Sequence, residues 1–182
     1  MSDRLVFNVG AMQGRTVLPS RLVFVRRETE TRIHILLKLF GLLLFQRERL
    51  EIEPHIDDPF MPFVPDLAQF DYQGRIALWV ECGECAISKL DRLAVKAPDA
   101  EIWVVRRSAE AAGDVLQRMA QEGLRRARYG VVGMDAAMLE EVEQLCVARN
   151  DVVWHRASWQ DQVIQFEFNG LWFDCGFTVG RH

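Results

Sequence analysis

The feature that most constrains the fold is an apolar segment at residues 33–45, which is typical of a helix buried on most of its sides. The segment is too short to span a bilayer, and His34 and Lys38 interrupt it, so it predicts a core helix over residues 31–46. A helix that is apolar around most of its circumference packs under other elements, such as a sheet. Its one polar stripe, Glu30, His34 and Lys38, repeats every four residues and therefore lies on one face.

Short runs of β-branched and aromatic residues predict the strands. Residues 5–9 and 21–25 predict two antiparallel neighbours. The strands predicted at 75–81 and 101–105 are separated by a helical stretch at 88–96, which predicts a parallel βαβ crossover. The remaining elements are a proline-rich loop at 53–70, helical stretches at 109–127 and 136–149 around a strand at 129–132, and a terminal hairpin of 163–168 and 171–173 joined by Asn169-Gly170.

These elements predict a mixed α+β fold of the α/β type, with a central mixed β-sheet flanked by helices, in one domain covering residues 1–182. A chain of 182 residues with 49% hydrophobic and 26% charged residues has the composition of an ordinary globular protein. The sequence begins without the pattern of a signal peptide and has four cysteines, which predicts a cytoplasmic protein with free thiols and no membrane partner.

The net charge of −4 argues against a uniformly basic surface for nucleic acid. Three short arginine clusters could still form a local basic surface if folding brings them together. The alternative is that they lie on separate solvated faces. The clusters are Arg26-Arg27, Arg106-Arg107, and Arg125-Arg126 with Arg128.

Asp66 and Glu81 are the candidate metal ligands. If residues 67–72 pair with the strand that ends at Glu81, through a turn at Gln73-Gly74, paired residue numbers add up to 147 and the two acids lie directly opposite. Opposed side chains share a face with Cβ atoms about 5 Å apart, so two carboxylates there need a cation or a proton between them. Mg²⁺ or Mn²⁺ suits such a pair and could activate water for phosphodiester cleavage, although both acids could equally be ordinary surface carboxylates.

Lys89 lies in the first turn of the helix that follows Glu81. A helix that follows a parallel strand begins over the carboxyl end of that strand, where open α/β sheets bind their ligands. Lys89 could therefore stabilise charge on an attacking water or a phosphoryl oxygen. The alternative is that it only solvates its helix.

The sequence from the polar stripe to Lys89 resembles the bacterial YaeQ family. The residues that carry the resemblance are Glu30-Thr31, residues 48–51, Pro65-Asp66-Leu67, residues 74–83 and Lys89. It implies a variant of the PD-(D/E)XK nuclease core, with Asp66 and Glu81 as its acids, Lys89 as its lysine moved onto a helix, and Glu30 as an additional acidic group. Gly83 stands where the usual motif has lysine, and the family has no settled biochemical function.

Three hypotheses follow for the function. The first is an Mg²⁺- or Mn²⁺-dependent nuclease-like phosphodiesterase acting on nucleic acid, with Asp66, Glu81, Lys89 and Glu30 as its site. The second, which Gly83 motivates, is a catalytically degenerate module that binds nucleic acid or a protein partner. The third is a dithiol redox protein that uses Cys82-Gly-Glu-Cys85, because this motif lies between a strand end and a helix.

Overall fold

The structure, a computed structural model, describes residues 4–11 and 18–182. The helices in these residues are α1 (Arg32–Phe45), α2 (Ile87–Lys96), α3 (Ala109–Gln121) and α4 (Ala136–Leu145). The strands are β1 (Arg4–Ala11), β2 (Arg21–Val25), β3 (Leu50–Ile52), β4 (Leu67–Phe70), β5 (Ile76–Cys82), β6 (Glu101–Arg106), β7 (Tyr129–Gly133), β8 (Arg149–Ser158), β9 (Val163–Phe168), β10 (Leu171–Gly176) and β11 (Thr178–Arg181).

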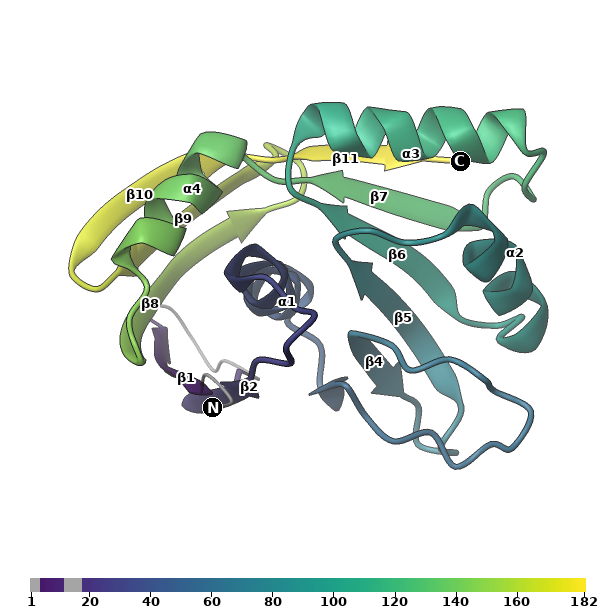
Figure 1. Cartoon of the computed structure of the whole chain (residues 1–182), viewed down its shortest axis with the longest axis horizontal. Helices are drawn as coiled ribbons and strands as arrows, with labels where there is room; N and C mark the ends of the chain where they lie inside the picture. The colour runs from purple at the N-terminus through teal and green to yellow at the C-terminus, as the bar shows by residue number, and fades with distance from the viewer. Residues whose placement is uncertain (1–3, 12–17) are drawn as a thin grey trace.

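The strands form two mixed sheets, and α1 lies between them (Figure 1). One sheet has the order β10-β9-β8-β1-β2, with β1 and β8 parallel, and the other has the order β11-β7-β6-β5-β4-β3, with β5, β6 and β7 parallel. The sequence predicts one central sheet, and the structure differs because ten of the fourteen residues of α1 are buried. A single sheet covers only one side of a helix, so burial on most sides takes a second layer.

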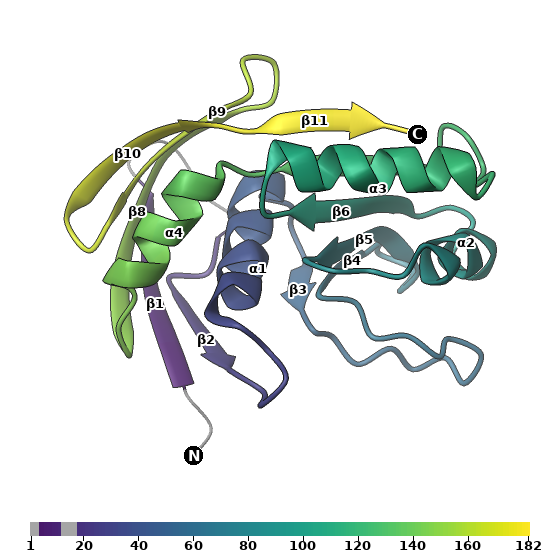
Figure 2. The same cartoon turned by 45° about the horizontal axis from the view of Figure 1, so that its top comes forward.

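The six-stranded sheet separates two hydrophobic clusters. Val80 and Cys82 of β5 face the cluster around α1, whereas Trp79 faces the cluster that contains α2 and α3. Figure 2 shows α2 and α3 on that second side, with α4 close to α1. Because side chains alternate along a strand, Glu81 faces the α2 side while its neighbours in sequence face α1.

Most of the predicted elements are confirmed. β1 and β2 are antiparallel, β5-α2-β6 is a parallel crossover, and β9 and β10 form a hairpin with positive φ at Asn169 and Gly170. The proline-rich loop ends earlier than predicted, because β4 begins at Leu67. The helices predicted at 109–127 and 136–149 end at Gln121 and Leu145, and the sequence did not predict β3, β8 or β11.

Helix α1 begins with a side-chain cap. Thr31 has an extended backbone, and its hydroxyl oxygen accepts a hydrogen bond from the backbone N–H of His34, as is usual at a helix N-terminus. The helix starts next to the carboxyl ends of β5 and β6, which places its polar stripe beside the end of β5 (Figure 1). No helix in the described part of the chain is long and apolar enough to cross a membrane.

Candidate functional site

Both predicted acids lie at the carboxyl end of β5, but the prediction that they share a face is wrong, because Asp66 contacts α1 and Glu81 contacts Lys89 of α2. Leu67 of β4 pairs with Val80, Ala68 with Trp79, and Gln69 with Leu78, so the predicted sum of 147 is confirmed for these three pairs. Asp66 immediately precedes β4, and its Oδ2 accepts a hydrogen bond of 2.7 Å from the backbone N–H of Cys82. The Asp66 carboxylate therefore closes the end of the β4–β5 ladder, one residue beyond Glu81.

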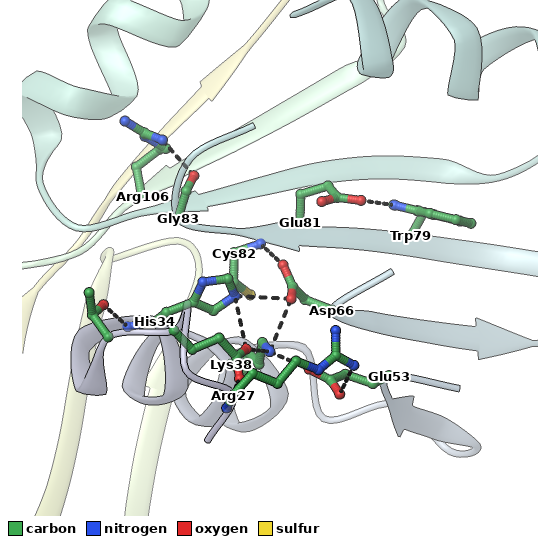
Figure 3. A network of polar contacts seen from close by, with 12 residues as sticks. Arg27, His34, Lys38, Glu53, Asp66, Trp79, Glu81, Cys82, Gly83 and Arg106 are labelled. Atoms are coloured by element: carbon green, nitrogen blue, oxygen red, sulfur yellow. Dashed lines mark hydrogen bonds and ion pairs between the residues drawn. The ribbon is translucent and has the colours of Figure 1, made fainter. Parts of the chain in front are cut away.

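The other oxygen of Asp66 faces α1. Its Oδ1 lies 3.0 Å from His34 Nε2 and 3.3 Å from Lys38 Nζ (Figure 3). Burial favours the neutral acid, but the hydrogen bonds from His34 and Cys82 and the charge of Lys38 outweigh it and lower the pKa of Asp66. Asp66 is thus a half-buried anion that the side chains of His34 and Lys38 already contact.

Lys38 is the centre of this network. Its side chain is only 2% exposed, and its Nζ contacts Glu30 Oε1, Glu53 Oε1 at 2.5 Å and Asp66 Oδ1. Glu53 also accepts a hydrogen bond of 2.8 Å from Arg27. We call Glu30, His34, Lys38, Glu53 and Asp66 the Lys38 cluster.

The charges of the Lys38 cluster stabilise one another. Burial alone would lower the pKa of Lys38, but hydrogen bonds to Glu30 and Glu53 and the charge of Asp66 raise it well above its usual value. Burial likewise disfavours ionised Glu30, and the hydrogen bond from Lys38 reverses this and lowers the pKa of Glu30. Glu30, Lys38 and Asp66 are therefore ionised at neutral pH, and the Lys38 ammonium lies between these two carboxylates.

Glu81 has its own cation on the opposite side of β5. Its Oε1 accepts hydrogen bonds from Trp79 Nε1 at 2.6 Å and from Lys89 Nζ at 2.7 Å. Burial raises the pKa of Glu81, and the nearby charge of Asp66 adds to the increase, while Lys89 partly offsets it. In Figure 3, Glu81 and Trp79 lie on one side of β5, and Asp66 and the α1 residues lie on the other.

The predicted site residues are thus divided between two groups. Asp66 and Glu30 belong to the Lys38 cluster, and Glu81 pairs with Lys89. Within residues 4–11 and 18–182, no group of three or more His, Cys, Asp or Glu side chains is arranged to hold a metal ion. The arrangement at this strand end is one of two neighbouring carboxylates, each neutralised by a lysine.

The two cysteines of the CxxC motif do not share an environment. Cys82 is buried in the cluster around α1, whereas Cys85 packs against the cluster on the α2 side. Burial raises the pKa of Cys82 well above its usual value and that of Cys85 to about 12. A redox dithiol needs a thiol with a lowered pKa, so this geometry does not favour the redox hypothesis.

Sequence reasoning placed Lys38 on the right face but did not assign it to the site. The four-residue spacing of Glu30, His34 and Lys38 contained that signal, since Lys38 reaches back to Glu30 along the helix. Glu53 gave no such signal, because it comes from an irregular loop and reaches Lys38 only through the tertiary fold.

The comparisons with known proteins agree with this layout. The family model described as YaeQ protein matches residues 12–166. The chain belongs to the YaeQ family. Two solved YaeQ structures share its fold. The YaeQ protein from Xanthomonas axonopodis pv. citri has a TM-score of 0.70 at 19% identity, with 100% of this chain and 99% of that chain covered. The YaeQ protein from Pseudomonas syringae has a TM-score of 0.74 at 13% identity, with 100% and 97% covered.

No curated protein matches the chain. The YaeQ likeness therefore establishes a family and a fold, and the two solved structures carry no activity in their descriptions. Any statement about chemistry has to come from the residues at the end of β5.

Proposed function

We propose that this YaeQ-family chain is a metal-dependent, nuclease-like phosphodiesterase that acts on nucleic acid. The observation that carries the proposal is the 2.7 Å ion pair of Lys89 with Glu81, beside Asp66 at the same strand end. Two acids and a lysine at this position match the order implied by a variant of the PD-(D/E)XK core. A cytoplasmic location is part of the proposal, and the free thiols Cys82, Cys85 and Cys175 support it.

Carboxylate oxygens are the ligands that a hard divalent ion such as Mg²⁺ or Mn²⁺ prefers. Asp66 and Glu81 face opposite sides of β5, however, and each contacts a lysine, so one ion would bind both only after their side chains turn. Asp66 and Glu81 offer carboxylate oxygens, and such ions are often bound by one or two carboxylates together with water and substrate phosphate. Trp79 and Lys89 both contact Oε1 of Glu81. When bound, the ion would polarise a phosphoryl oxygen and lower the pKa of a water molecule.

The other residues of the site have distinct roles in this proposal. Lys89 would stabilise the negative charge that develops on the phosphoryl group. In this role it would replace the lysine that the usual motif has at position 83, where this chain has glycine. Glu30 would act through Lys38, because it fixes the ammonium that in turn holds Asp66. Glu30 and Lys38 are therefore positioning residues.

A second candidate function is a module that binds nucleic acid or a protein partner without cleaving it. The observation that favours it is the Lys38 ammonium, which contacts three carboxylates including Asp66. An ammonium in that place neutralises Asp66 without a metal ion, as expected of a site that has lost catalysis.

Calorimetric titration with MnCl₂ separates the two candidates, when combined with a cleavage assay on single- and double-stranded DNA and RNA. The variants are Asp66→Asn, Glu81→Gln and their combination, with Glu51→Gln as a control that removes the same charge from the exposed edge strand β3. Metal binding and cleavage that both disappear in the double variant support the nuclease. Binding without cleavage supports the degenerate module, and the absence of binding at millimolar Mn²⁺ refutes the metal site.

A further inference from the structure

A cavity of about 460 Å³ lies next to the site, at the carboxyl ends of β5 and β6. Its lining includes Thr31, which caps α1, and His34 of α1, together with Gly83 and Glu84 after β5 and Arg106 and Arg107 at the end of β6. The carboxyl ends of parallel strands are where open α/β sheets bind ligands.

Arg106 is a buried cation with an unused donor. The residue is 7% exposed, its Nη1 donates to the Gly83 carbonyl at 2.5 Å, and its Nη2 contacts Glu84 Oε1 at 2.5 Å. Its Nε has no hydrogen-bond partner among the described residues. A guanidinium presents a planar fork of donors that matches the oxygens of a phosphate group.

Glu84 occupies the place of an anion on that fork. Its side chain is 85% exposed, although the Arg106 side chain that it contacts is 8% exposed. An exposed carboxylate loses little when it turns into water, because solvent replaces most of its interaction with the arginine. Glu84 can therefore leave and expose Arg106 to a ligand.

The rest of the lining favours an anion once Glu84 has left. The charged residues of the lining are Arg106, Arg107, Glu84 and Glu143, so their charges balance with Glu84 in place and leave one excess positive charge without it. Arg107 also contacts Glu140, outside the lining, at 3.3 Å. The first turn of α1, capped by Thr31, directs backbone N–H groups and the positive end of the helix dipole to this region.

His34 connects the cavity with the acidic site. Its Nε2 contacts Asp66, and its Nδ1 would lie 3.8 Å from a Cβ on Gly83, which lines the cavity. A group bound in the cavity would thus lie one side chain away from Asp66. In Figure 3, Arg106 and Gly83 lie at the end of β5, beyond Cys82, His34 and Asp66.

We propose that this cavity binds a phosphate group, which replaces the Glu84 carboxylate on Arg106. The inference deepens the proposed function and rests on it for its substrate, since the group would be a phosphate of the nucleic-acid strand next to the one that is cleaved. Binding of inorganic phosphate requires neither metal nor cleavage, so the phosphate site is tested separately.

The test is calorimetric titration with sodium phosphate at constant ionic strength in metal-free buffer. If Glu84 holds Arg106 about nine-tenths of the time, Glu84→Gln binds phosphate about tenfold more tightly, because an apparent dissociation constant is the intrinsic constant divided by the competent fraction. Glu51→Gln, which changes the same charge outside the cavity lining, should bind like the wild type. Arg106→Lys should bind more weakly, because it keeps the charge and loses the fork.

Two outcomes overturn the proposal. One is the absence of phosphate binding by both wild type and Glu84→Gln, and the other is an equal gain in Glu84→Gln and Glu51→Gln. Neither depends on whether Arg106→Lys folds. Metal-dependent cleavage without phosphate binding would remove the phosphate site and leave the proposed function standing.

A parallel titration with a single-stranded tetranucleotide distinguishes the source of the phosphate. A tighter complex of Glu84→Gln with the tetranucleotide supports a nucleic-acid phosphate in the cavity. If only inorganic phosphate binds, the cavity is confirmed as a phosphate site and the link to a nucleic-acid substrate fails.

Discussion

Replacement of Lys38 by methionine is the sharpest test of the Lys38 cluster. The substitution keeps most of the side-chain volume and removes the ammonium that contacts Glu30, Glu53 and Asp66. Removal of one partner of a buried ion pair leaves an uncompensated charge, which costs about 3–5 kcal/mol. Glu53 keeps Arg27, and Asp66 keeps His34 and the Cys82 N–H, so the lower part of that range applies.

The expected loss for Lys38→Met is therefore about 3–4 kcal/mol at pH 7. For a chain of this length, that loss lowers the Tm by about 6–16 °C, since each kcal/mol corresponds to about 2–4 °C. Thermal unfolding followed by circular dichroism measures it. Lys96→Met is the matched control, because Lys96 is exposed at the end of α2 and should change stability by no more than about 0.5 kcal/mol.

The same variant carries a pH signature. The pKa values of Glu30 and Asp66 are lowered in the folded protein, so their stabilising effect is present at neutral pH and is lost as the pH falls through those values. Without Lys38, the pKa of Glu30 loses its largest lowering contribution and the pKa of Asp66 loses one of several, so both acids take up protons at higher pH than in the wild type. The stability difference between wild type and variant should thus shrink between pH 7 and about pH 4. A Tm equal to that of Lys96→Met, or a difference that does not vary with pH, would refute the charge argument.

Three further predictions concern the neighbouring groups. Lys89→Met should raise the pKa of Glu81 further, because Lys89 partly offsets its burial, and carbon-detected NMR titration of the carboxyl measures the change. Gly83→Ala should destabilise the fold by about 1–2 kcal/mol, because φ at Gly83 is +78°. Gly113→Ala inside α3 should instead stabilise the fold by about 0.5–1 kcal/mol, and chemical denaturation measures both changes. Iodoacetamide at pH 8 should leave Cys82 unmodified and modify Cys85 slowly, because burial raises both thiol pKa values, and rapid labelling of either, followed by mass spectrometry, would contradict this.

Local patterns predicted local structure well. The helix over residues 31–46, the strand pairing around Gly74 and the Asn169-Gly170 hairpin are confirmed because each depends on neighbours in the sequence. The second sheet was not predicted, because β1 pairs with β8 across more than a hundred residues, and no periodic pattern records such a partner.

For the site as well, the sequence predicted what depends on local spacing and missed what depends on tertiary contacts. The spacing around the β4–β5 turn placed Asp66 and Glu81 at one strand end. It could not show that the Asp66 carboxylate turns to α1 while Glu81 faces α2, because Asp66 lies outside the regular strand. Lys38, Glu53 and Arg106 were not assigned for a related reason: their roles arise from burial and from partners that only the tertiary fold supplies.

The five-stranded sheet that covers α1 combines strands from the start of the chain with strands from near its end, and this has a consequence for synthesis on the ribosome. β1, β2 and α1 are translated first, yet β1 needs β8 as its parallel partner and α1 needs the complete sheet as its cover. The apolar helix must therefore wait, partly uncovered, until residues 149–176 have emerged from the exit tunnel. Strands that lie far apart in the sequence pair slowly, and the folding intermediates that form before they pair expose apolar surface and tend to aggregate. Nascent chains stalled before β8 should accordingly bind chaperones, and chains stalled after β10 should release them.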